Sequence, residues 1–580
     1  MTAPEGLTGL AGLGLRALGE AFGSRLAWLS PRPVTFRAQG ISLPLAAAPR
    51  AHRNDPGDLY RGRFQLAGVD VACEGRIVFE HDPGNEAWLA ALHGFGWLHD
   101  LLDGRRQLQK VFARTLIGDW EERHGSLPPQ ALDPAVMALR VMHWIAAAAL
   151  LLDGAEEGFA RTFFTSLTWQ TRRLARLGRG PGNARARLLV RLALAHAAIG
   201  LRGLENMREA ALARLGAELE RQILPDGGHV SRNPARLVEI AAFLLPLRAA
   251  METARLAVPP EMRHALERAL PMVRFFRHGD GGLALFNGVS DPAGGQVAAI
   301  LEADMVRGRP LSHAPHSGYG RLMQGAGLVI ADVGRPPAPG LNPDAALSVA
   351  AFEFSHGPMR IITNCGAPRI ANPAWQRAAR LSRAHSCALA GEGEAGRIVD
   401  NALIRRLFGG PALLGPEHVR AELRESTQGS LLEVSHDAFA GSCGLAHARR
   451  LFLAPGGEDL RGEDRFTPVE EGKPAQPTPL VLRFHLHPSV DASMSRDGLS
   501  VMLRLADKSG WTFSARKGRV RLEESVSLAS ETGLRRSSQI VVESICEQGG
   551  ETIKWFLRRL GEAPRKRGPE DDGDNPRLPL

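Results

Sequence analysis

Aromatic residues and cysteines are scarce in this sequence. Phe, Trp and Tyr make up 6% of its 580 residues, and only Tyr60 and Tyr319 are tyrosines. None of the five cysteines belongs to a Cys-x-x-Cys pair, which excludes the common zinc-finger and thioredoxin-like motifs. An odd and scattered set of cysteines predicts no disulfide framework and indicates no redox compartment.

Long hydrophobic runs are also missing. No stretch of about 18 or more apolar residues occurs, and the run at residues 145–152 is far too short to span a bilayer. Residues 1–29 mix Gly, Leu and Ala with charged side chains, without a basic segment followed by a clean apolar core. We therefore expect no transmembrane segment and no signal peptide, and the pattern of residues 1–29 is typical of an amphipathic helix.

The sequence contains no Walker loop, no Rossmann glycine fingerprint and no Gly-x-Ser-x-Gly elbow. It also lacks a basic stripe interleaved with aromatic residues, so no nucleic-acid partner is expected. The overall balance is nevertheless basic, with a net charge of +9. Such a surface favours polyanions, among them acidic polysaccharide, nucleic acid and anionic membranes, without choosing between them.

What is present is the composition of a large globular chain. The sequence is 44% hydrophobic and 23% charged, and its length suits three to four average domains or two large ones. Residues 30–83 alternate apolar and polar positions in short pieces, such as 77–80, which predicts a small β-rich segment. Residues 1–84 are therefore expected to form an N-terminal helix and this β-rich segment.

From residue 85 to about 277 the apolar positions follow helical spacing. Helices are predicted near 157–177, 185–202, 205–223, 235–250 and 260–276, and short loops join them. No fixed repeat period appears. Consecutive antiparallel helices of this kind indicate an α/α toroid, an incomplete helical barrel, over residues 85–305.

Beyond Pro310 the pattern changes to β-branched or alternating pieces separated by turn signals. These pieces include residues 328–332, 359–364, 448–453, 481–487, 501–505 and 539–543. The pattern predicts a C-terminal antiparallel β-sandwich over residues 306–560, and the fold class is therefore α+β multidomain. Residues 561–580 are strongly charged and are expected to form a disordered tail.

The most distinctive loop is Leu-Pro-Asp-Gly-Gly-His-Val-Ser-Arg-Asn-Pro at residues 224–234. Its glycines permit a turn with positive φ, and His229, Arg232 and Asn233 follow closely. That set suits an acidic sugar, because Arg binds carboxylates, His carries protons and Asn donates hydrogen bonds. The alternative is an ordinary connection between helices, with Asn233 as the N-cap and Pro234 at the first helical position.

The sequence resembles the heparinase II/III family of polysaccharide lyases in its predicted order, helices followed by a β-sandwich, and in several short motifs. The resemblance spans roughly residues 85 to 545 and is closest to a bacterial branch distinct from the lyases of known substrate. The similar stretches are residues 92–100, 226–234, 275–282, 317–319, 352–353, 364–366, 384–386, 460–464 and 483–488.

The resemblance implies β-elimination on a uronic-acid-containing acidic polysaccharide, in a cleft between toroid and sandwich. The reaction needs a group that neutralises the uronate carboxylate, a base for the α-proton and an acid for the leaving oxygen. Members of the family are similar in using Asn, His, Arg and Tyr for these roles. The residues expected here are catalytic His229, Tyr319 and His385, and substrate-binding Arg232, Asn233 and Asn183.

Each of these residues also has a structural interpretation. His229 can cap a helix or pack in the interior, and Arg232 can be a surface residue. Tyr319 can be an aromatic residue at the edge of the sandwich. His385 can bind substrate or a metal, or it can simply be a buried side chain.

The sequence departs from the family pattern at three positions. The family's Asn-His pair falls near Asn183 and Ala184, its loop Tyr falls at Arg236, and a His of the β-domain falls near Ala346. Two hypotheses follow. The first is a polysaccharide lyase, and the second is a catalytically altered or inactive protein of the same fold that binds glycans or assists envelope polysaccharide assembly.

No catalytic metal or cofactor is expected. His485 and His487 alternate on one predicted strand and share a face, so with Asp437 or Asp464 they are candidates for a structural divalent metal, although His pairs on strands are more commonly packing residues. Location follows only from the resemblance, which implies the cell envelope or periplasm, while the lack of a signal peptide leaves the cytoplasm open. The sequence gives no indication of oligomeric state.

Overall fold

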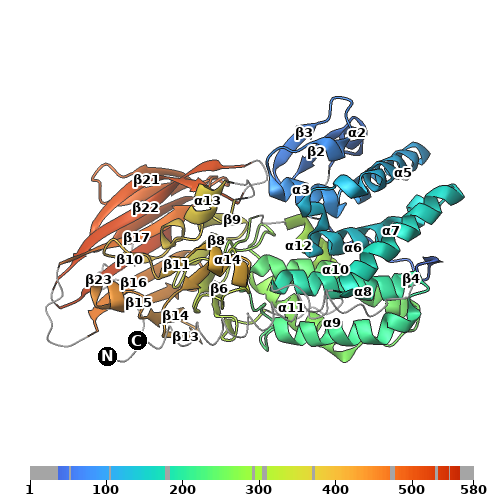
Figure 1. Ribbon diagram of the computed structural model, residues 1–580. Coiled ribbons are helices and arrows are strands. Elements are labelled where there is room, and N and C mark those ends of the chain that lie inside the picture. Colours follow the sequence, from blue (N-terminus) through green and yellow to red (C-terminus); the bar gives the residue numbers. More distant parts are fainter. Residues whose placement is uncertain are drawn as a thin grey trace.

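The computed structural model describes residues 37–561, except 51–53, 103–105, 177–182, 291–293, 304–309, 369–371, 470–476, 530–532 and 548. The predicted amphipathic helix of residues 1–29 and most of the predicted charged tail lie outside this range. Helices form one half of the molecule and β-sheets form the other, with the N-terminal residues of the described chain on the helical half (Figure 1).

The N-terminal segment is attached to the helical half. Strand β1 (Gly40–Ile41) pairs with β4 (Leu201–Arg202), and β2 (Arg63–Leu66) and β3 (Val69–Ala72) form a hairpin after the short helix α2 (Pro56–Tyr60). The strand predicted at 77–80 is wrong, because Val78–Glu80 is a 3-10 turn. A single turn buries both Val78 and Phe79, whereas an extended strand would send neighbouring side chains to opposite faces.

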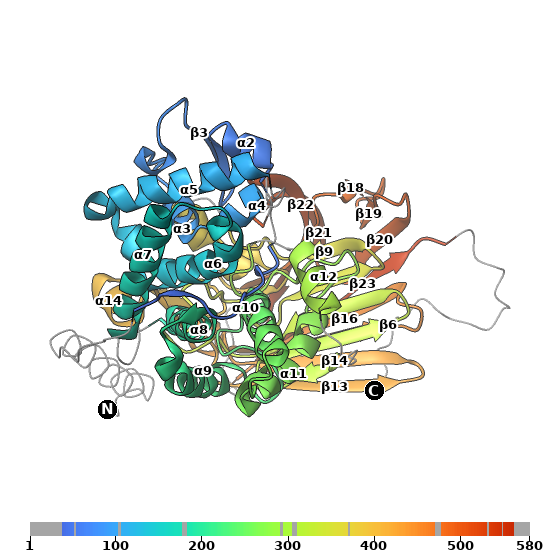
Figure 2. The same ribbon diagram turned by 90° about the vertical axis from the view of Figure 1, so that its right-hand side faces the viewer.

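The helical half is built from consecutive helices of 5 to 20 residues, which the views in Figures 1 and 2 show stacked side by side. Helix α6 begins where Asp133 accepts hydrogen bonds from the amides of Ala135 and Val136, with Pro134 at the first helical position. The helices of this half are α3 (Glu86–Gly94), α4 (Leu98–Leu102), α5 (Gln107–Glu122), α6 (Pro134–Leu152), α7 (Glu157–Arg176), α8 (Ala184–Gly200), α9 (Arg208–Gln222), α10 (Pro234–Thr253), α11 (Pro260–Phe275) and α12 (Gly294–Glu302), with 3-10 turns at His124–Ser126, Pro129–Leu132 and Glu205–Met207.

Helix α6 is the one helix of the described chain that is long and apolar enough to cross a membrane, by length and composition alone. Two-thirds of its apolar stretch is buried (67%), where it packs mainly against α8 and α3. Burial in the helical core therefore accounts for its composition without a membrane.

Two antiparallel sheets form the second half. In the described chain the larger sheet has nine strands in the order β21-β22-β17-β9-β8-β7-β6-β5, with β10 paired to β17, and the smaller has eight in the order β13-β14-β15-β16-β23-β20-β19-β18. Leu432, Phe484, Trp511 and Trp555 belong to the core between them. An antiparallel β-sandwich is thus observed where the sequence predicted one.

The strands of the larger sheet are β5 (His313–Ala314), β6 (Tyr319–Gln324), β7 (Gly327–Asp332), β8 (Phe352–His356), β9 (Met359–Thr363), β10 (Ala388–Ala390), β17 (Thr478–Leu486), β21 (Arg519–Ser527) and β22 (Arg535–Cys546). Those of the smaller sheet are β13 (Val419–Ser426), β14 (Gly429–His436), β15 (Leu445–Leu453), β16 (Asp459–Pro468), β18 (Asp491–Met494), β19 (Ser500–Arg504), β20 (Gly510–Ala515) and β23 (Glu551–Arg559). Loops between them carry the pair β11 (Arg397–Val399) and β12 (Ala412–Leu414), the helices α13 (Pro373–Ala378), α14 (Ala402–Phe408) and α15 (Ala440–Cys443), and the 3-10 turn Ser382–Ala384.

The two halves share a continuous, partly polar interface. The hydrophobic core of the helices extends to Tyr319, Ile330 and Ala351 of the sandwich. The buried ring of His278, after α11, bonds through Nε2 to Glu353 Oε2 at 3.0 Å and through Nδ1 to Ser355 Oγ at 2.8 Å, both on β8. These contacts fix the helical half against the larger sheet.

Candidate functional site

The Asp-Gly-Gly loop between α9 and α10 contacts the sandwich half and so joins the two halves. Gly227 has φ +84°, and a Cβ atom there would lie 1.9 Å from the carbonyl oxygen of Arg268, so only glycine fits. The carboxylate of Asp226 accepts from the amide of Gly228 at 2.9 Å and, across the interface, from the amide of Ser317 at 2.7 Å. The loop predicted from the sequence as a sugar site is therefore an interdomain contact.

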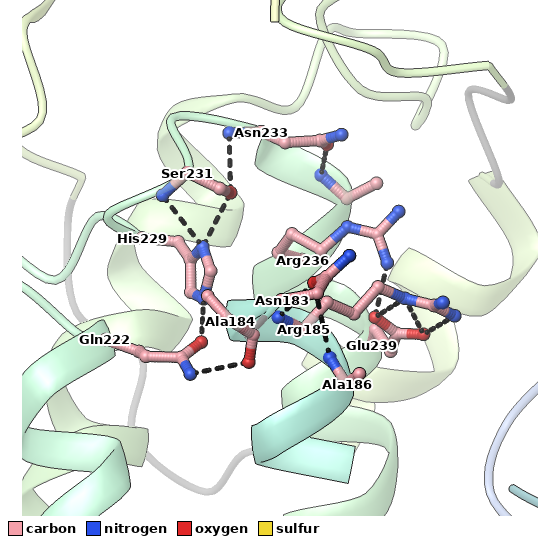
Figure 3. Close-up of polar contacts among 11 residues, drawn as sticks. Asn183, Ala184, Arg185, Ala186, Gln222, His229, Ser231, Asn233, Arg236 and Glu239 are labelled. Carbon is pink, nitrogen blue, oxygen red and sulfur yellow. Dashed lines mark hydrogen bonds and ion pairs between the residues drawn. The ribbon is translucent and has the colours of Figure 1, made fainter. Parts of the chain in front are cut away.

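His229 is buried and has a hydrogen-bond partner at each ring nitrogen (Figure 3). Nε2 lies 2.9 Å from Oε1 of Gln222, whose own amide nitrogen donates to the Ala184 carbonyl, so Nε2 is the protonated nitrogen. The lone pair of Nδ1 then faces the Ser231 hydroxyl at 2.6 Å and the Ser231 amide at 3.1 Å. Burial lowers the pKa of His229 to about 3, which keeps the ring neutral.

Arg232 spans the interface from the helical side in a left-handed backbone conformation, with φ +57°. Its guanidinium donates to the carbonyls of Ser317 (2.8 Å), Gly318 (2.7 Å) and Arg335 (2.7 Å), and to Asp332 Oδ1 at 2.5 Å. Every guanidinium nitrogen therefore has a protein acceptor.

Tyr319, at the start of β6, is fully buried beneath Arg232, whose guanidinium carbon lies 4.8 Å from the ring centroid. Its hydroxyl donates to the Arg232 carbonyl at 2.5 Å and accepts from Nδ2 of Asn287 at 2.8 Å. Burial raises the pKa of this hydroxyl well above its ordinary value, so it stays protonated.

The two predicted asparagines are helix caps. Asn183 accepts from the amides of Arg185 and Ala186 at the start of α8, and Asn233 accepts from the amide of Ala235 at the start of α10. His385, by contrast, faces a cavity. It lines a polar interdomain pocket of about 130 Å³, while its Nδ1–H donates to the carbonyl of Leu381 at 3.0 Å.

The structure thus brings His229, Arg232, Asn233 and Tyr319 into one interdomain cluster, with Asn183 nearby on α8. None of these five lines the interdomain pocket or the larger cavity between the helices. His229 borders a void of about 10 Å³, which has room for about one water molecule at most. Whether they act on a substrate stays a prediction, but the ring nitrogens of His229, the guanidinium nitrogens of Arg232 and the hydroxyl of Tyr319 are already engaged within the protein.

Three charged residues that the sequence analysis did not propose for the site, Arg185, Arg236 and Glu239, lie beside this cluster (Figure 3). Glu239 of α10 accepts from Arg185 at 2.6 Å and from Arg236 at 2.5 Å. Burial alone would raise the pKa of Glu239, but the two guanidinium groups lower it to about 2. Arg236 occupies the position at which the family resemblance placed a tyrosine. The spacing of Arg236 and Glu239, three residues apart on a predicted helix, was the available signal.

These residues form one wall of a cavity of about 440 Å³ between the helices, which we call the toroid cavity. The lining of the toroid cavity also includes Asp100, which accepts from Arg50 Nε at 2.9 Å and from the Asn54 amide at 3.0 Å. Arg236 lines both the toroid cavity and the interdomain pocket. Other residues lining the toroid cavity are Gln65, Trp97, His143, Phe243 and Gln296.

The candidate metal ligands His485, Asp437 and Asp464 each bond to different protein groups. His485 bonds through Nδ1 to Ser525 Oγ at 2.8 Å and through Nε2 to the Arg383 carbonyl at 3.0 Å. Asp437 pairs with His418, and Asp464 with Arg449 and His447. Among the residues that the structure describes, no group of three or more His, Cys, Asp or Glu side chains is arranged to hold a metal ion.

Comparison with known proteins agrees with this architecture. The family described as "Heparinase II/III-like, C-terminal" matches residues 306–556. Heparinase III is similar over 90% of this chain and 87% of its own, with a TM-score of 0.65 at 13% identity. The heparan sulfate lyase of Pedobacter heparinus is similar over 88% of this chain and 83% of its own, with a TM-score of 0.55 at 13% identity. At these identities the two structures establish the fold, a helical toroid followed by a β-sandwich, as predicted.

A relative of higher sequence identity is not named as a lyase. FtsZ-localized protein C of Caulobacter vibrioides is 34% identical over 564 residues, which cover 93% of each chain. Taken with the matched family domain and the shared fold, this similarity shows that the chain belongs to the heparinase II/III family.

Proposed function

We propose that this protein binds an acidic saccharide at the wall of the toroid cavity that carries Arg236, and that it does not cleave the saccharide by β-elimination through His229 and Tyr319. The observation that carries the proposal is the Arg185–Glu239–Arg236 cluster. It puts a paired guanidinium where the family resemblance places a proton-transferring tyrosine.

Elimination needs a base with a free lone pair within reach of the substrate. The Nδ1 lone pair of His229 faces Ser231, and the Tyr319 hydroxyl donates to the Arg232 carbonyl. Both side chains are buried, and burial shifts both pKa values away from the range useful for general base catalysis near neutral pH. Their positions support a structural role at the toroid–sandwich junction.

The charge of the cavity wall supports an anionic ligand. Arg50, Arg185 and Arg236 face two carboxylates, Asp100 and Glu239, which leaves one positive charge in excess. Arginine binds carboxylates through a planar pair of donors, and Trp97 and Phe243 add aromatic surface against which a sugar ring can pack. Uronate-containing oligosaccharides combine both features.

Two measurements on the same purified protein test this function. Calorimetry with uronate oligosaccharides is expected to show binding that weakens about tenfold or more in Arg236→Gln, since a charge-assisted hydrogen bond is lost. Ultraviolet absorbance of an unsaturated uronate product is expected to stay flat. A rising absorbance that is abolished by Tyr319→Phe would instead establish a lyase and refute the proposal.

A second function is favoured by the relative of 34% identity. We propose that this chain, like that protein by its name, is localised with FtsZ, which points to a place other than the periplasm. A fluorescent fusion is expected to form bands that coincide with FtsZ in dividing cells. A diffuse or periplasmic signal that ignores FtsZ would contradict this localisation without bearing on saccharide binding.

A further inference from the structure

We propose that one face of α7 forms a binding site for a nucleotide that carries more than one phosphate. The site is a groove of about 580 Å³, which we call the α7 groove. Its described lining consists of Arg37, Thr165, Thr168, Trp169, Arg172, Arg173 and Arg176. None of these residues lines the toroid cavity or the interdomain pocket, so the inference is independent of the proposed saccharide site.

Helix α7 contributes to the groove along a single face. Its lining residues, at positions 165, 168, 169, 172, 173 and 176, recur at the spacings that repeat on one side of an α-helix. From Thr165 to Arg176 this face is about 16 Å long, at a rise of about 1.5 Å per residue. The N-terminal segment brings Arg37 beside it, because the amide of Ala38 donates to Oγ1 of Thr168 at 3.0 Å. Figure 1 shows α7 in the helical half, on the side away from the sandwich.

The α7 groove is basic. Its four arginines carry four positive charges, and no Asp or Glu among the described lining residues opposes them. A nucleoside triphosphate carries about three to four negative charges near neutral pH, since the second ionisation of a phosphate has a pKa of about 6. Guanidinium groups bind phosphate oxygens through planar, often bidentate hydrogen bonds. The charge of the groove therefore fits a polyphosphate better than a single carboxylate.

Trp169 favours a nucleotide over inorganic polyphosphate. Its ring is partly buried, and the guanidinium carbon of Arg173 lies 5.7 Å from the ring centroid. Indole rings and guanidinium planes both stack on nucleobases. The pair thus offers a surface for a base directly beside the arginines that would hold the phosphates.

Size favours a single nucleotide over a nucleic-acid strand. Proteins that bind single strands cover about four or more nucleotides, for which a helix face of about 16 Å is short. A volume of about 580 Å³ lies within the range of about 300–1,000 Å³ that is usual for small-molecule sites.

The test is calorimetry on the full chain with three probes: GTP, inorganic tripolyphosphate and guanosine. Wild type is expected to bind GTP about fivefold or more tightly than tripolyphosphate, because stacking adds to the contacts of the phosphates. Guanosine is expected not to bind measurably, since it has no phosphate. Equal affinities for GTP and tripolyphosphate would overturn the assignment, as would a complete lack of GTP binding.

Two kinds of variant separate stacking from charge. Trp169→Ala is expected to reduce the affinity for GTP to that for tripolyphosphate and to leave tripolyphosphate binding unchanged. Trp169→Phe keeps an aromatic ring, so it is expected to fold and to retain most of the preference for GTP. Arg176→Gln is expected to weaken both ligands about tenfold, because a charge-assisted hydrogen bond is lost, and Arg176 is exposed, so the fold should be unaffected. An equal loss of both ligands in Trp169→Ala would contradict the stacking role.

A matched control comes from Arg424 on β13, an exposed arginine of the smaller sheet that pairs with Glu422. Arg424→Gln is expected to bind GTP like wild type, and equal effects of Arg176→Gln and Arg424→Gln would overturn the assignment. Arg176→Gln is expected to leave the binding of uronate oligosaccharides unchanged. A hexaglutamate peptide that binds more tightly than GTP would refute the nucleotide site and assign the groove to an acidic protein segment.

Discussion

Replacing Arg232 by methionine separates a structural role from a substrate-binding role. The guanidinium donates hydrogen bonds to three carbonyls of the sandwich and pairs with Asp332. The Arg232 side chain is 8% exposed and that of Asp332 is 1% exposed. Methionine keeps much of the apolar stem but leaves Asp332, among the residues that the structure describes, with only the Ser348 hydroxyl and the Gly334 amide as partners. We therefore expect Arg232→Met to destabilise the fold severely.

The expected cost follows from the burial of both partners. Breaking a buried ion pair by removing one side costs about 3–5 kcal/mol, because the other charge stays uncompensated. With an unfolding entropy of roughly 1 kcal/mol/K for a chain of this size, that cost lowers the melting temperature by about 3–5 °C. Asp332→Asn in the same chain is expected to recover part of the loss, on the order of 1 kcal/mol or more.

Urea unfolding followed by tryptophan fluorescence measures this cost, with Arg424→Met as the exposed control, expected within about 0.5 kcal/mol of wild type. The reasoning would be refuted by an Arg232→Met protein of wild-type stability that has lost saccharide binding. That result would assign Arg232 to the ligand, as the sequence analysis predicted.

Three further predictions follow from the same contacts. Tyr319→Phe removes a buried hydroxyl that donates to the Arg232 carbonyl and accepts from Asn287, and is expected to cost about 1–3 kcal/mol of stability in denaturant titrations, with saccharide affinity unchanged. Glu239 has a folded-state pKa of about 2 against an ordinary 4.5, so its ionisation stabilises the fold above pH 4.5 and that stabilisation, on the order of 3 kcal/mol, is lost as pH falls through about 2. The stability difference between wild type and Glu239→Gln should therefore shrink over that window, and a pH-independent difference would contradict the assignment. Chelators and added zinc are expected to leave the melting temperature unchanged, because His485 already bonds to Ser525 and the Arg383 carbonyl, and a metal-dependent shift would show that a divalent ion belongs to the fold.

Much of the fold was predictable because its signals are local. Asn183 and Asn233 are helix caps that stand at the starts of α8 and α10, and the β-branched strand at 328–332 corresponds to β7. Helix α5 was missed although Ala113, Leu116, Ile117 and Trp120 are buried at helical spacing, because no N-cap side chain marks its start. The strand predicted at 77–80 failed because a short apolar run cannot distinguish a strand from a single turn.

The site was less predictable because its geometry depends on contacts between distant parts of the chain. The sequence marks His229 and Arg232 as unusual polar residues in a loop, but it does not reveal that their partners are Gln222 and the backbone near Ser317. The sequence did not indicate Arg380 as a pocket residue, since a single arginine after a short helix is ordinary. Arg380 lines the interdomain pocket because the toroid and the sandwich are packed against each other.

The most direct test of the central claim is to incubate the purified protein with uronate oligosaccharides, measuring binding by calorimetry and cleavage by ultraviolet absorbance in the same samples. The account predicts binding that is weakened by Arg236→Gln, without any rise in absorbance. Cleavage that depends on His229 or Tyr319 would contradict it, and so would a complete lack of binding.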